Sequence, residues 1–99
     1  MENKPVVATA RLIVKPGEVE RIKFTLKSLI VATRKEPGCI SYDFYQSAYN
    51  KHLFISHEVW GSHEIFAKHL ESPYILALLE QGDDLLVQPL EVMFLEPLG

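Results

Sequence analysis

Runs of β-branched and aromatic residues divide this chain into four predicted strands. They lie at residues 6–14, 39–47, 53–60 and 89–96. Between the first two, apolar residues recur at spacings of three and four, the pattern of a helix with one buried face; they are Val19, Ile22, Leu26, Leu29 and Thr33. A second helical segment should begin after Ser62 and restart at Ser72-Pro73, because serine caps helices and proline suits their first turn. Residues 82–84 are expected to form a turn.

The resulting order is β-α-β-β-α-β, which predicts an α+β fold of the ferredoxin-like kind. Such a fold has a four-stranded antiparallel sheet with its helices on one face. The 99 residues suffice for one domain and are too few for two, so a single domain is expected over residues 1–99. The first residues are interpreted as leading into a strand and not as a signal peptide, because Arg11 interrupts the apolar run and no cleavage-like site follows.

Apolar residues occur on both faces of the predicted strands. In the first strand, Ala8, Ala10 and Leu12 share one face, whereas Val7 and Ile13 share the other. The third and fourth strands show the same mixture. Helices can cover only one face, and a bare second face would expose more apolar area than soluble monomers usually tolerate. We therefore expect a homodimer in which the two sheets pack face to face, forming a dimeric α+β barrel.

Composition excludes several function classes. The net charge is −3 with no run of Lys or Arg, so a nucleic-acid partner is not expected. The five glycines are isolated, so no glycine-rich loop for a nucleotide or flavin is present. One cysteine allows no internal disulfide, and no apolar run is long enough to span a bilayer. We expect a cytoplasmic protein with no membrane partner. His63 and His69 lie six residues apart, not the four of a zinc-protease helix, so no metal is expected either.

Three residues are candidates for catalysis. His69 borders the predicted apolar helix face, where an imidazole could accept a proton near neutral pH or could be structural. Glu58 and Trp60 share one face of the third strand. A buried glutamate needs a partner, which could be a histidine or Arg11, unless Glu58 lies at an edge. Trp60 could belong to the core or form the wall of a cavity.

Aromatic residues are the candidates for ligand binding. The phenol rings of Tyr42, Tyr45 and Tyr74 could line an apolar pocket and donate a hydrogen bond to a ligand oxygen. Because Tyr42 and Tyr45 are three residues apart in a strand, they point to opposite faces, and at most one faces the helices. Phe66 lies on the apolar stripe of the second helical segment.

Three segments of the sequence together resemble those of a known protein family. They are EPGCISYDFYQS at 36–47, HEVWGSHEIFAKHLESP at 57–73 and PLEVMFLEPL at 89–98. Their order and spacing resemble the antibiotic biosynthesis monooxygenase family, in which Glu58, Trp60, His69, Ser72 and Pro73 match recurrent positions. The resemblance implies a ferredoxin-like protomer, a homodimer and an apolar pocket between helices and sheet. It also implies oxidation of quinols or polycyclic aromatics by dioxygen without a metal or flavin cofactor.

Some relatives of this family degrade haem. They carry asparagine, tryptophan and histidine where Ala10, His69 and Leu79 stand here, so haem degradation is not expected. Two hypotheses follow. The chain is a cofactor-independent monooxygenase acting on a quinol or aromatic polyketide-like substrate, or a dimeric small-molecule-binding or isomerase protein of the same fold without oxygenase activity.

Overall fold

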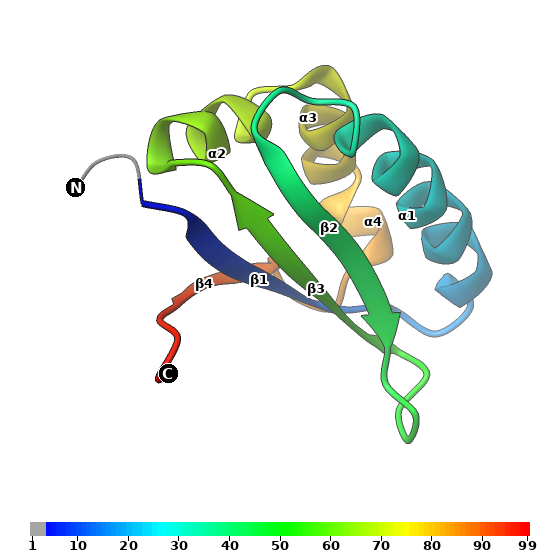
Figure 1. Cartoon of the computed structure of the whole chain (residues 1–99). Coiled ribbons are helices and arrows are strands. Elements are labelled where there is room, and N and C mark those ends of the chain that lie inside the picture. The colour runs from blue at the N-terminus through cyan, green and yellow to red at the C-terminus, as the bar shows by residue number, and fades with distance from the viewer. Residues whose placement is uncertain (1–3) are drawn as a thin grey trace.

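Four antiparallel strands form one sheet in the order β2-β3-β1-β4 in the computed structural model, which describes residues 4–99. The strands are β1 (Val6–Ile13), β2 (Cys39–Gln46), β3 (Leu53–Trp60) and β4 (Glu91–Leu95). The helices are α1 (Val19–Thr33), α2 (His63–Leu70), α3 (Pro73–Glu80) and α4 (Gly82–Leu85). Helices α1, α2 and α3 cover one face of the sheet (Figure 1). The predicted ferredoxin-like fold is confirmed over the described residues; residues 1–3 of the predicted domain lie outside them.

Local sequence signals explain where the elements begin and end. The Ser62 hydroxyl accepts a hydrogen bond from the backbone N–H of Ile65 at 3.2 Å, which caps α2 as predicted. Pro73 occupies the first turn of α3, but the Ser72 side chain makes no capping hydrogen bond. Gly38 has a φ of 86°, a left-handed conformation that lets the chain reverse between α1 and β2.

The core lies between the sheet and the helices. The buried apolar side chains come from alternate positions of the strands and from one stripe of each helix. They include Ala8, Ala10, Leu12, Ile22, Leu26, Leu29, Phe54, Trp60, Ile75 and Leu78. The predicted periodicity of the first helix is therefore confirmed, since four of its five residues are fully buried.

The first two strands each end one residue earlier than predicted, and two further elements differ more. Residues 82–84, expected as a turn, belong to the short helix α4, in which the N–H of Leu86 bonds to the carbonyl of Gly82 at 2.8 Å. The last strand is shorter than the predicted 89–96 and begins at Glu91. Pro89 has no N–H to offer a strand ladder, which explains its exclusion.

The second face of the sheet is open in the single chain and carries apolar side chains, as predicted. Four of them are large and exposed by 38% to 59%: Tyr45, Ile55, Met93 and Leu95. Arg11 and Glu91 pair across the same face at 3.4 Å. Within residues 4–99, no helix is long and apolar enough to cross a membrane.

Candidate functional site

A cavity of about 50 Å³ lies between the sheet and helices α2 and α3. Its wall is apolar except for the side chains of Tyr42, Glu58 and His69. The apolar lining residues are Ala10, Leu12, Phe44, Phe66, Leu70, Ile75, Leu78, Leu79, Leu90 and Val92. A few polar groups converging on an otherwise apolar cavity are typical of a small-molecule site.

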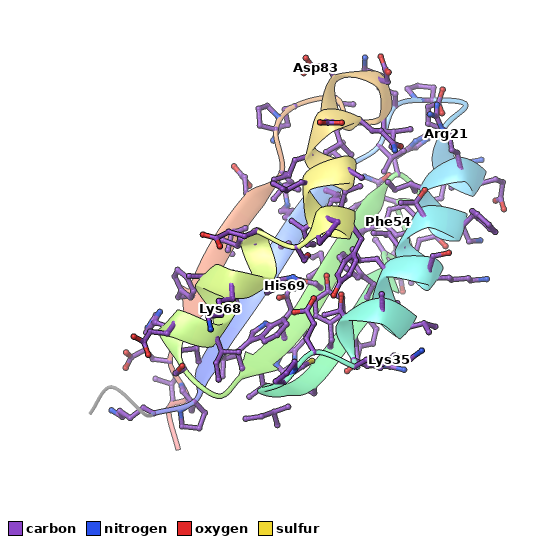
Figure 2. The ribbon with its side chains drawn as sticks, turned by 90° about the horizontal axis from the view of Figure 1, so that it is seen from above. Arg21, Lys35, Phe54, Lys68, His69 and Asp83 are labelled. Carbon is purple, nitrogen blue, oxygen red and sulfur yellow. The ribbon has the colours of Figure 1, made fainter. Side chains whose placement is uncertain are left out.

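Strand register and helix spacing bring the polar groups together. Tyr42 on β2 lies opposite Glu58 on β3, so both side chains leave the sheet on its helix-covered face. His69 comes from the buried side of α2, three residues after Phe66, and is only 2% exposed. Figure 2, viewed from above the helices, shows His69 in the interior, between α1 and the α2–α3 pair.

His69 is held by both its ring nitrogen and its ring faces. Its Nδ1 lies 3.1 Å from Oε1 of Glu36, which stands in the short connection between α1 and β2. The hydroxyl of Tyr74, on α3, donates a hydrogen bond to the other carboxylate oxygen of Glu36. The Trp60 ring lies against the imidazole with centroids 4.4 Å apart, and Tyr42 meets it edge-on at 5.4 Å. The imidazole is thereby fixed at the cavity wall.

Glu58 is buried with two uncharged hydrogen-bond donors. The Trp60 indole N–H donates to Oε1 at 3.0 Å, and the Ser56 hydroxyl donates to Oε2 at 2.7 Å. Ser56 in turn accepts from the backbone N–H of Ala10 at 2.7 Å. Glu58 is 5% exposed, so these bonds offset the cost of taking a carboxylate out of water.

Both partners suggested for Glu58 are therefore wrong, and so is an edge position. His69 bonds to Glu36, and Arg11 pairs with Glu91 on the open face. Arg11 cannot reach Glu58 because side chains alternate between the two faces of a strand. Ala8 pairs with Glu58 and shares its face of the sheet, whereas Arg11, three residues further along β1, points to the other face.

The candidate binding residues separate into three groups. Tyr42 and Phe66 line the cavity. Tyr45 is 59% exposed on the open face, so of the two strand tyrosines it is Tyr42 that faces the helices. Tyr74 binds Glu36 instead of lining the cavity, and Trp60 packs beneath His69.

The surroundings raise the pKa of two tyrosines, Tyr42 and Tyr74. Burial, together with the nearby Glu58 carboxylate, raises the pKa of Tyr42 far above its ordinary value. Burial and the hydrogen bond to Glu36 raise the pKa of Tyr74 to about 12. Both phenols are therefore neutral O–H groups at physiological pH and can act as hydrogen-bond donors.

The sequence interpretation missed Glu36, which lies 33 residues before His69. The one available signal was its position at the start of the EPGC string that carries the family resemblance. In the described part of the chain, no group of three His, Cys, Asp or Glu side chains is arranged to hold a metal ion. The chemistry that the cavity wall itself offers is proton transfer and hydrogen bonding.

Comparisons with known proteins agree with this architecture. Residues 5–81 match the family model described as antibiotic biosynthesis monooxygenase. The "Putative monooxygenase Rv0793" of Mycobacterium tuberculosis is 35% identical over 95% of this chain and 92% of its own. The solved structure of Rv0793 superposes on this chain with a TM-score of 0.88, and the match covers 97% of both chains. The solved structure of PA3566 from Pseudomonas aeruginosa superposes with a TM-score of 0.90 at 25% identity. That match covers 100% of this chain and 99% of the other.

A third relative is longer. The uncharacterized protein sll1783 of Synechocystis is 34% identical over 89% of this chain, and the match spans only 60% of that protein's length. The family model covers most of the chain, including every polar side chain of the cavity wall. The chain therefore belongs to the antibiotic biosynthesis monooxygenase family.

Proposed function

We propose that the protein is a cofactor-independent monooxygenase that oxidises a quinol or polycyclic aromatic with dioxygen in this cavity. The observation that carries the proposal is the position of His69. It is a buried imidazole on the wall of an apolar cavity, with a carboxylate bound to its Nδ1. Such a group can accept the proton of a phenolic O–H placed in the cavity.

The substrate itself supplies the electrons. Deprotonation by His69 produces an electron-rich quinolate, which reduces dioxygen. One oxygen atom enters the ring and the other leaves as water, with the two electrons and two hydrogens coming from the quinol. A naphthoquinol, C10H8O2, plus O2 thus gives a hydroxynaphthoquinone, C10H6O3, plus H2O. The apolar wall keeps bulk water from the anion, and Tyr42, whose hydroxyl stays protonated, lines the same cavity.

The cavity must enlarge to admit such a ring. About 50 Å³ is less than the roughly 150 Å³ known to accommodate one benzene molecule. A surface depression of about 500 Å³ lies next to it, and Leu78, Leu79 and Leu90 line both spaces. Leu79 is 48% exposed and therefore the side chain with most freedom to turn aside. Substrate enters from this depression by displacing Leu79.

A second candidate is a binding or isomerising protein that uses the same pocket. It is favoured by the fact that a histidine–carboxylate pair can move a proton between two positions of a bound ligand without dioxygen. Oxygen consumption separates the two candidates.

The proposal includes a homodimer formed through the open face of the sheet. That face presents Tyr45, Ile55, Met93 and Leu95, and a two-fold axis would place the same apolar patch against itself. Pairing would remove this exposed apolar area from water, which favours association.

The function is tested by oxygen uptake with a reduced naphthoquinol, using metal-stripped protein and the autoxidation rate as blank. We expect catalysed uptake, and in ¹⁸O2 one labelled oxygen atom in the product. Uptake no faster than the blank, with ligand binding detected by calorimetry, would favour the second candidate. Label absent from the product would exclude a monooxygenase.

A further inference from the structure

We infer that Glu36 and Tyr74 are positioning residues that hold His69 in one tautomer, with the proton on Nδ1 and the lone pair on Nε2. This inference rests on the proposed function for its consequence in catalysis, but the tautomer can be measured in the free protein. Neither residue lines the cavity; each acts through the imidazole.

Donor and acceptor chemistry fixes the direction of each bond. A carboxylate can only accept hydrogen bonds, so the 3.1 Å contact requires a hydrogen on Nδ1 of His69. The second oxygen of Glu36 accepts from the Tyr74 hydroxyl, which the raised pKa keeps protonated. Neutral His69 carries one ring hydrogen, so Nε2 is left as the nitrogen available to a ligand.

The neighbouring side chains restrict rotation of the His69 imidazole. Trp60 lies against one side of the imidazole and Tyr42 and Phe66 meet it within about 6 Å, so rotation would require the core to repack. The side chain of Glu36 is only 17% exposed, so its bond to His69 is shielded from solvent. When Nε2 accepts a proton, the carboxylate stabilises the imidazolium that forms.

Replacing Glu36 by glutamine should reverse the tautomer. In Glu36→Gln the Tyr74 hydroxyl still has an oxygen to donate to, which turns the new NH2 group toward His69. That NH2 donates to Nδ1, so the ring hydrogen must move to Nε2 and the base is lost. In the double variant Glu36→Gln/Tyr74→Phe the amide is free to rotate, and part of the Nδ1–H tautomer should return.

The test is ¹⁵N NMR of histidine-labelled protein at a pH where imidazoles are neutral, with the His69 signals assigned from their loss in His69→Gln. We expect Nδ1–H in the parent, Nε2–H in Glu36→Gln, and a turnover at least about 100-fold lower in that variant with little change in melting temperature. Glu71→Gln, an exposed glutamate at the end of α2, is the matched control and should behave as the parent.

An Nε2–H tautomer in the parent would overturn the inference. So would a Glu36→Gln variant that keeps both the Nδ1–H tautomer and the parental turnover. If the parent consumes no oxygen but shows the expected tautomers, the proposed function fails and the positioning role stands.

Discussion

The indole N–H of Trp60 donates to Oε1 of Glu58 over 3.0 Å, while the same ring lies 4.4 Å from the imidazole of His69. One side chain thus joins the buried carboxylate of β3 to the histidine of α2. Both contacts occur in the core, where Trp60 is fully buried. Trp60 therefore has a structural task that can be measured without any substrate.

Replacing Trp60 by phenylalanine should lower the free energy of unfolding by about 2–4 kcal/mol. The variant leaves Glu58 short of one donor and leaves part of the indole volume empty. Glu58→Leu should also destabilise the fold, because it leaves the indole N–H unpaired. The double variant removes both partners, so its loss should be about 1–2 kcal/mol smaller than the sum of the two. Urea unfolding measures all four proteins, and strict additivity would contradict the bond.

Gly38→Ala should destabilise the fold more than Gly17→Ala. Both glycines have a φ near 87°, so each alanine pays about 1–2 kcal/mol for the left-handed conformation. A Cβ at Gly38 would also clash with Cδ1 of Ile65, whereas at Gly17 it meets nothing within 4 Å. Gly38→Ala should therefore lose about 1–3 kcal/mol more unfolding free energy than Gly17→Ala, as measured by urea unfolding. This additional loss should vanish when both alanine variants are made in an Ile65→Ala background. If the additional loss persists there, Ile65 is not its cause.

Stability should fall as pH rises from about 10 to about 12, and Tyr74 should contribute to the fall. Burial and the Glu36 hydrogen bond raise the pKa of Tyr74 to about 12, against 10 in the unfolded chain. In this window the unfolded chain has lost the phenolic proton and the folded chain keeps it, so unfolding is favoured as pH rises. Urea unfolding of Tyr74→Phe across this window should show a shallower decline. The exposed Tyr49→Phe is the control; equal slopes in both variants would contradict the assignment.

The open face of the sheet should hold two chains together. Light scattering after size-exclusion chromatography at micromolar concentration should give about twice the chain mass of 11.3 kDa. Met93→Lys places a charge within the apolar patch and should shift the mass toward one chain. Val31→Lys, on the exposed side of α1, should leave it unchanged. A monomeric parent protein would exclude this arrangement.

The strands and helices could be predicted because their signals are local. Residues 53–60 are rich in β-branched and aromatic residues, as strands are, and the structure has β3 at Leu53–Trp60. Helix α4 was missed because four residues beginning with Gly82 give too short a pattern to separate a helix from a turn. Because side chains alternate along a strand, the sequence showed that Tyr42 and Tyr45 point to opposite faces of the sheet. Which of these faces the helices cover depends on how the strands and helices pack together.

The site was only partly predictable, because its central contact is not local. His69 and Glu58 stood out as polar residues among apolar neighbours. Glu36 adjoins a helix end and a proline, where a charged residue is ordinary, and nothing in the spacing links it to His69. Similarly, Tyr74 was expected in the pocket because phenols suit ligands, yet its hydroxyl binds Glu36 instead.

The initial rate of oxygen uptake by His69→Gln shows whether His69 is the base for oxidation of a bound quinol. Glutamine keeps a polar group against Glu36 and limits the loss of packing at this buried position. His63→Gln, on the exposed side of α2, is the matched control. We expect a rate about 10²–10⁴-fold below the parent for His69→Gln and a parental rate for His63→Gln. A folded His69→Gln protein that retains the parental rate would contradict this role.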